Sequence, residues 1–152
     1  MFENKRNIIS FLLFIFGWIF IGSCKKESKT NTAPEISNLV ISPNSIVEWV
    51  DSVKIRFDYK DLEGDIGEED PNIKTLEIKD SRLEESDFYH IQPLTPTDKV
   101  YSSQGTLTVK LNSMFRLGNA AFEKFTFTVS LRDKAGNKSN VIRSDTLQVS
   151  KF

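Results

Sequence analysis

From Pro34 onward, apolar and polar side chains alternate along much of the chain. Apolar residues occupy every odd position in 53–59, and the same pattern recurs in 107–111 and 125–131. A period of two is typical of β-strands that bury one face and expose the other. Shorter apolar runs bounded by Pro, Gly, Asn, Asp or Ser predict four more strands, at 36–41, 73–78, 88–91 and 141–149.

These seven short strands predict an all-β fold. No stretch after residue 34 shows a long amphipathic helix, although 114–122 has room for a single helical turn. The expected architecture for 34–152 is an immunoglobulin-like or fibronectin-type antiparallel β-sandwich of about seven strands, without a disulfide in its core. Five aromatic residues are interpreted as core packing rather than as a ligand platform: Trp49, Phe57, Tyr59, Phe125 and Phe127.

The N-terminal segment has the pattern of a signal peptide. Lys5 and Arg6 precede an almost unbroken apolar run at 8–21. This run is shorter than the roughly 20 helical residues needed to cross a bilayer. It therefore fits the apolar core of a cleaved signal better than a membrane-spanning helix.

The motif Ile21-Gly22-Ser23-Cys24 follows directly. It resembles the lipobox of bacterial lipoproteins, which implies cleavage after residue 23 and acylation of Cys24. Cys24 is the only Cys in the chain. If it were not acylated, an exported protein would carry a free reactive thiol with no Cys to pair with. Two alternatives are an ordinary secretory signal with a stray Cys, and a short membrane anchor.

Residues 24–33 are polar and lack apolar periodicity, which predicts a flexible tether after the lipidated Cys. Two or more acyl chains suffice for stable anchoring, so the membrane is the first predicted partner. Lys25 does not resemble the Asp that retains lipoproteins in the inner membrane of enteric bacteria. The expected location is the outer membrane, at its periplasmic face or on the cell surface.

The overall charge favours no class of macromolecular partner. The 152 residues include 20 Lys and Arg against 21 Asp and Glu, a net charge of −1. A balance of this kind gives no reason to expect nucleic-acid binding. Any partner must therefore be inferred from local features.

Catalytic motifs are absent from the sequence. The only His is His90, and no nucleophile elbow, zinc-protease helix or phosphate-binding loop occurs. Asp61 and Asp133 could in principle act as a glycosidase pair, but the crowding of acids around Asp61 disfavours this. We therefore expect a protein that is not an enzyme.

One short loop concentrates negative charge. Residues 61–72 hold six carboxylates and no Lys or Arg. In an immunoglobulin-like sandwich this loop and 133–137 would lie at the same end, beside the start of the first strand, where Glu35 could join them. Ca²⁺ takes six to eight oxygen ligands, and the candidate metal ligands are Asp61, Glu63, Asp65, Asp133 and Asn137.

Two features bear on this calcium hypothesis. Gly64 and Gly67 would let the backbone curl so that alternate carboxylates point inward. The loop is not an EF-hand, because Ile66 replaces the Gly of the sharp turn and Asn72 replaces the bidentate Glu. The alternative is a solvated acidic turn beside a second, ordinary turn.

The segments "YKDLEGDIG", "IKDSR" and "LRDKAGNKSNVI" follow one another in this order. Together they resemble an uncharacterised family of Bacteroidota lipoproteins with DGDGDIG-like, DSR and DKAGNxSN segments. The last turn also resembles that of bacterial immunoglobulin-like adhesin domains. Neither resemblance implies a catalytic activity.

The sequence thus predicts a noncatalytic cell-envelope lipoprotein. Its β-sandwich would serve in binding or in supporting a surface assembly, with an unknown protein or glycan as partner. The alternative is a glycan-binding accessory lipoprotein of an outer-membrane polysaccharide uptake system, which would expose aromatic side chains for stacking on sugars.

Overall fold

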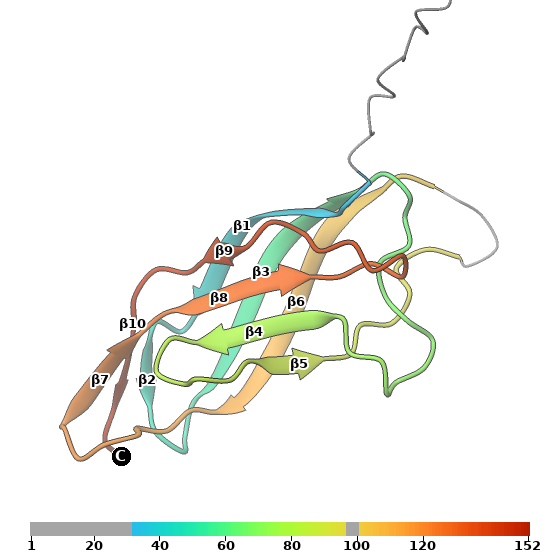
Figure 1. Cartoon of the computed structure of the whole chain (residues 1–152). Coiled ribbons are helices and arrows are strands. Elements are labelled where there is room, and N and C mark those ends of the chain that lie inside the picture. The colour runs from blue at the N-terminus through green and yellow to red at the C-terminus, as the bar shows by residue number, and fades with distance from the viewer. Residues whose placement is uncertain (1–31, 97–100) are drawn as a thin grey trace, which may run out of the picture. The chain divides into compact units, whose positions relative to one another are not determined.

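The computed structural model describes residues 32–96 and 101–152 (Figure 1). The predicted signal peptide at 1–23, Cys24 and most of the predicted tether lie outside these residues. The described part contains ten strands and no helix, so no helix there could cross a membrane. The strands are β1 Glu35–Ser42, β2 Ser45–Val47, β3 Ser52–Asp61, β4 Leu76–Asp80, β5 Asp87–Tyr89, β6 Ser103–Ser113, β7 Phe122–Phe125, β8 Phe127–Leu131, β9 Ile142–Arg143 and β10 Leu147–Ser150.

The strands form three sheets in the order β1-β3-β6, β5-β4-β8-β9 and β2-β10-β7. Every pairing is antiparallel except that of β10 with β2. Figure 1 shows the four-stranded sheet in front of the β1-β3-β6 sheet. The two layers have the arrangement of a β-sandwich, and the predicted all-β fold is confirmed.

The core is one cluster that draws on all three sheets. Odd-numbered residues of β3 and β8 point inward, which is the facing that the alternation predicts. The buried apolar residues are Ile36, Ile46, Val53, Ile55, Phe57, Ile66, Leu76, Ile78, Ile91, Leu111, Phe125, Phe127, Val129, Leu131, Leu147 and Val149.

Two of the predicted strands are each divided between two sheets. The run 125–131 changes partner at Thr126, whose backbone N–H and C=O bond to Ser81 instead of continuing one ladder. The run 141–149 is interrupted near Ser144, whose hydroxyl accepts a hydrogen bond from Phe127 N. Each run therefore gives two short strands.

Three other expectations about the elements differ from the structure. The strand predicted from residue 73 begins at Leu76, because Ile73 lies in a turn closed by its N–H to the Asp70 carbonyl. The three-residue strand β2 was not predicted. The segment 114–122 contains bends and the start of β7 rather than a helical turn.

The aromatic residues confirm the core interpretation except at one position. Phe57, Phe125 and Phe127 are buried, and Tyr59 is partly buried against the core. Trp49 is 66% exposed, so its assignment to the core was wrong. It follows β2 in a turn rather than lying on a strand face.

Candidate functional site

The two loops singled out by the sequence lie together at one end of the sandwich. Ile66, in the loop between β3 and β4, forms an isolated antiparallel bridge with Asp133, which follows β8. Lys134 N donates to the Asp65 carbonyl at 3.2 Å. The prediction that these loops meet at one end is therefore confirmed.

The start of β1 joins them. The side chain of Asn140 accepts a hydrogen bond from Ile36 N at 2.8 Å and donates one to Ile36 O at 2.8 Å. Asn137 Nδ2 lies 3.5 Å from Thr32 Oγ1. The loop after β8 thus fastens the first strand at the point where the described chain begins.

Each loop is organised around its first Asp, and both of these carboxylates are almost fully buried. Asp61 is 1% exposed, and its oxygens accept hydrogen bonds from the N–H groups of Glu63 and Asp65. Asp133 is 2% exposed and accepts from the backbone and side-chain nitrogens of Asn137. These bonds are typical of Asx turns, and they satisfy part of the hydrogen-bonding capacity of the four oxygens.

Asp65 lies between these two carboxylates and is less well satisfied. Its Oδ2 accepts a hydrogen bond from Ala135 N at 3.2 Å, while its Oδ1 is buried and has no hydrogen-bond partner in the described chain. Burial, followed by the negative charges of Asp133 and Asp61, raises the pKa of the Asp65 carboxyl. Asp65 is therefore close enough to Asp61 and Asp133 to be repelled by both.

No positive side chain offsets this charge within the described ranges. The ion pairs found there join Arg82 to Asp80 and Glu123, Arg116 to Glu48, and Lys138 to Glu77. A buried carboxylate without a counter-charge is unfavourable. The cluster of Asp61, Asp65 and Asp133, here called the Asp cluster, is therefore a strained electrostatic site.

The remaining predicted ligands are placed differently. Asn137 lies in the Asp cluster through its bonds to Asp133, whereas the repulsion on Asp65 comes from Asp61 and Asp133 rather than from Glu63. As arranged in residues 32–96 and 101–152, no three His, Cys, Asp or Glu side chains form a group ready to hold a metal ion. A metal would therefore need these side chains to move closer together and additional oxygen ligands.

The acidic loop is fixed in place by its glycines. Gly64 and Gly67 both have positive φ, as expected for a backbone that curls sharply. A Cβ on Gly64 would lie 1.8 Å from the Tyr101 carbonyl oxygen, and one on Gly67 would lie 2.3 Å from that of Gln92. The loop consequently packs against the segments before and after residues 97–100.

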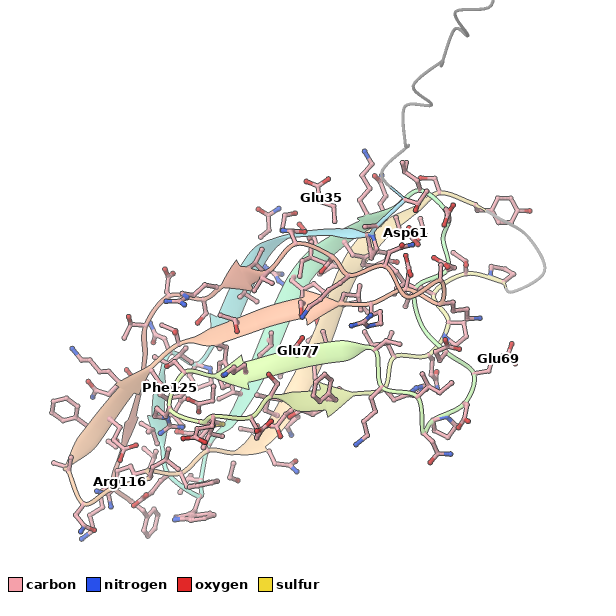
Figure 2. The ribbon with its side chains drawn as sticks, in the orientation of Figure 1. Glu35, Asp61, Glu69, Glu77, Arg116 and Phe125 are labelled. Atoms are coloured by element: carbon pink, nitrogen blue, oxygen red, sulfur yellow. The ribbon has the colours of Figure 1, made fainter. Side chains whose placement is uncertain are left out.

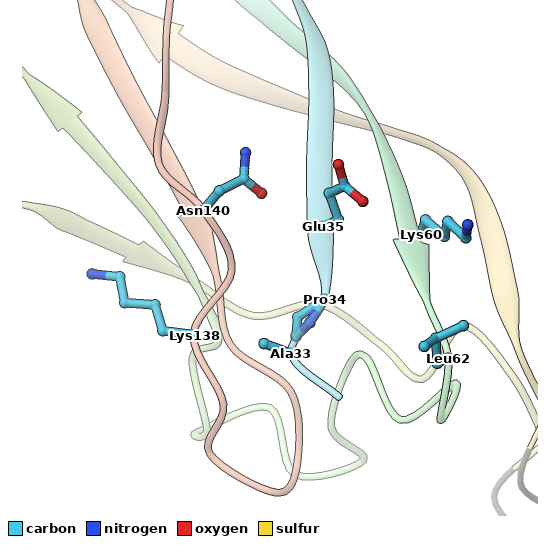
Figure 3. Close-up of a pocket in the computed structure, with 7 residues that line it drawn as sticks. All are labelled: Ala33, Pro34, Glu35, Lys60, Leu62, Lys138 and Asn140. Atoms are coloured by element: carbon cyan, nitrogen blue, oxygen red, sulfur yellow. The ribbon is translucent and has the colours of Figure 1, made fainter. Parts of the chain in front are cut away.

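An open cavity of about 630 Å³ lies beside the same end (Figure 3). Its charged lining comes from Glu35 at the start of β1, Lys60 in β3 and Lys138 in the loop after β8. Glu35 was expected to join the acidic loops, but it is exposed and faces this cavity, opposite Lys60 in the strand register. The charges of the cavity are mixed, and they specify no ligand class.

The opposite end of the sandwich carries a feature that the sequence interpretation missed. Trp49, in the turn between β2 and β3, stacks on Phe115, in the loop between β6 and β7, with ring centroids 5.2 Å apart and planes 7° apart. Both rings are exposed, Trp49 by 66% and Phe115 by 41%. Figure 2 shows the neighbouring Arg116 at the end of the sandwich away from Asp61.

The residues adjacent to the two rings hold the stack together. Arg116 donates from Nε and Nη2 to the two carboxylate oxygens of Glu48, at 3.1 and 3.0 Å. This bonding lowers the pKa of the Glu48 carboxyl. Trp49 N also donates to the Met114 carbonyl at 2.9 Å. The turn and the loop are therefore joined by this backbone hydrogen bond as well as by the Glu48–Arg116 ion pair.

A second charged group supports the same loop. Arg82 pairs with Asp80 and Glu123, donates to the Phe115 carbonyl, and lies 4.0 Å above the Phe125 ring. Glu123 in turn accepts from the N–H groups of Leu117 and Gly118, which lowers the pKa of its carboxyl. The loop that presents Phe115 is therefore held by directed bonds as well as by apolar packing.

His90 shows no catalytic arrangement. It follows the edge strand β5, and its Nδ1 lies 3.0 Å from the Ile73 carbonyl. That contact is to the backbone, and it gives the ring a structural role in the loop before β4.

Comparison with known proteins gives no further guide. No family model matches this sequence, and no curated protein matches it.

Proposed function

We propose that this chain is a noncatalytic cell-envelope lipoprotein of the outer membrane, with a β-sandwich tethered through acylated Cys24. The motif that ends in the only Cys, directly after the apolar run at 8–21, supports this assignment. The sandwich would serve in binding or in supporting a surface assembly. Metabolic labelling with a fatty-acid probe tests the anchor: the wild type should incorporate the label, and labelling that persists in Cys24→Ser would refute it.

We further propose that the sandwich is of the immunoglobulin-like class, in its fibronectin-type variant. β7 and β8 together form one bent strand of such a domain, and β9 and β10 form another. β2 is then the continuation of β1. This leaves seven strands in two sheets, with the fourth beside the third, as in fibronectin-type domains. An experimental structure of residues 32–152 in which these strands pair in another order would overturn the assignment.

The Asp cluster is proposed to bind Ca²⁺ and thereby fix the loop end of the domain. The observation that carries this proposal is the buried Oδ1 of Asp65, which has no hydrogen-bond partner in the described chain and belongs to a carboxylate repelled by the buried Asp61 and Asp133. Carboxylate oxygens that already accept one hydrogen bond retain a lone pair for a cation. Asp61, Asp65 and Asp133 would be ligands, with Glu63 and Asn137 completing the shell.

Thermal melts in Ca²⁺ and in chelator test this proposal. The expected gain is RT ln(1 + [L]/Kd), about 2.7 kcal/mol at a hundredfold excess over Kd. Mg²⁺ should help less, because it requires octahedral geometry and keeps its waters. Melting curves that coincide at millimolar Ca²⁺ and in chelator would show that the Asp cluster is a solvated turn.

Variants of the acidic loop give the matched controls. Asp61→Asn together with Asp65→Asn should abolish the gain from Ca²⁺, and Asp133→Asn should weaken it from the other loop. Glu69→Gln removes one charge from an exposed position of the same loop, away from the Asp cluster (Figure 2). If Glu69→Gln lost the gain as fully as the double variant, general charge rather than coordination would explain the effect.

A second candidate function is glycan binding, as an accessory lipoprotein of a polysaccharide uptake system. The observation that favours it is the exposed stack of Trp49 on Phe115. Aromatic faces that remain in solvent are typical of proteins that bind sugars through their C–H groups. A glycan array probed with residues 32–152 tests this function: binding to no glycan on the array would reject it.

A further inference from the structure

Trp49 combines two features that do not favour folding. Its φ of +64° lies in the left-handed region, which is a genuine outlier for a bulky residue and is unfavourable for the backbone. Its indole is 66% exposed and so contributes little burial energy. A strained residue that leaves a large ring in solvent points to a role in recognition rather than in stability.

We propose that Trp49, supported by Phe115, is a stacking platform for a pyranose ring of a neutral glycan. The inference rests on the second candidate function above and gives it a site. One indole face packs on Phe115, and its high exposure leaves the other accessible. An aromatic face is electron-rich, so it attracts the weakly positive C–H groups on the apolar face of a sugar ring.

The surroundings favour an uncharged ligand. Beside the rings, Glu48 and Arg116 neutralise each other through two hydrogen bonds, and their side chains are 10% and 13% exposed. Arg82 and Glu123, behind Phe115, are paired in the same way. Neither ion pair therefore offers net charge to an anionic or a cationic ligand, and the nearby Asp51 carboxylate accepts a hydrogen bond from Val47 N.

The platform is also held in place by contacts within the domain. Trp49 is fixed by its N–H bond to Met114, by the stack, and by the ion pair of the preceding residue with Arg116. Val47 N bonds to Asp51 Oδ2 across the same turn. Preorganisation of this kind reduces the entropy lost on binding, which matters for a site that offers a flat surface rather than an enclosed pocket.

Fluorescence provides a direct test, because Trp49 is the only Trp after residue 18. All ten strands and the whole core lie in the unit Asn31–Phe152, so residues 32–152 can be used alone. Dextran, laminarin, xyloglucan and galactomannan are titrated as probes. At least one should change the Trp49 emission in a saturable manner, with a matching isotherm by calorimetry.

Variants then locate the site. Trp49→Ala should weaken the calorimetric affinity about tenfold or more, by analogy with rings on which nucleic-acid bases stack, and Trp49→Phe should retain part of it. Trp49→Gly tolerates the positive φ, so it should fold at least as well as the wild type and still lose binding. Phe88→Ala, which removes a ring on β5 that is 51% exposed, should bind like the wild type.

Three results would overturn the proposal. They are the absence of saturable binding to all four polysaccharides, an affinity unchanged in Trp49→Gly, and self-association in sedimentation that Trp49→Gly abolishes. The last would make the aromatic pair a contact between copies. None of these results depends on the fatty-acid labelling or on the Ca²⁺ melts. Rejection of the stacking platform is therefore distinguishable from rejection of the proposed lipid anchor or of the proposed Ca²⁺ site.

Discussion

Phe127→Ala measures how strongly the sandwich depends on the facing of β8. Phe127 is 2% exposed, and its ring meets that of Phe125 edge to face, with centroids 5.3 Å apart at 87°. Removing a buried Phe costs about 3–5 kcal/mol, of which the aromatic contact accounts for about 0.5–1.5 kcal/mol. The hydrogen bonds between Phe127 and Ser144 involve the Phe127 backbone, so the substitution leaves them intact.

Thr126→Ala is the matched control. Thr126 is adjacent but half-buried, and the bonds that fix it to Ser81 also involve its backbone. Its substitution should cost less than about 1 kcal/mol. Denaturant unfolding, monitored by midpoint and slope for both variants, gives the comparison. Equal losses, or a larger loss for Thr126→Ala, would refute the assigned facing, because a one-residue slip exchanges the two faces.

Three further variants probe the loop end. In chelator, Asp65→Asn should stabilise the domain by roughly 1 kcal/mol through relief of like-charge repulsion. Because the folded-state pKa of Asp65 is raised, melts should show this advantage growing as the pH rises from the ordinary carboxyl pKa to the raised one, and levelling above the raised pKa. Asn140→Ala removes two hydrogen bonds to Ile36 and should lower the free energy of unfolding by about 1–3 kcal/mol, with faster hydrogen exchange in β1. Gly67→Ala would press a Cβ onto the Gln92 carbonyl at positive φ and should cost more than about 1 kcal/mol in denaturant titration. The clash should outweigh the roughly 0.4–1 kcal/mol by which a compatible Gly→Ala change stabilises a protein through backbone entropy.

The strands that could be predicted are those whose pattern is local. In β3 the alternation alone gives the buried face, and in β6 it does so over 107–111, where Leu111 is buried and Leu107 and Val109 are partly buried. That the loops 61–72 and 133–137 share one end also followed from the sequence, since strand order in a sandwich determines which loops lie together, although their Ile66–Asp133 bridge was not predicted. Local pattern combined with general topology was sufficient in these cases.

The features that could not be predicted depend on distant partners. Thr126 ends one ladder because Ser81, in a separate hairpin, takes its backbone bonds. β2 has only three residues, too few for a period, and it exists because β10 pairs with it. Trp49 was assigned to the core by residue type, whereas its exposure follows from a turn held by Met114 and Asp51.

The two hydrogen bonds between the Asn140 side chain and the Ile36 backbone also affect how the domain would respond to a pulling force. The start of β1 and the C-terminus lie at opposite ends of the sandwich (Figure 1), and β1 runs antiparallel to β3 over most of its length. Tension between those ends would act along the strands, so the β1–β3 hydrogen bonds would be sheared together rather than opened one at a time. Asn140 is hydrogen-bonded to β1 near its start, where the tension would be applied. The first strand would therefore resist extension until many hydrogen bonds break at the same time.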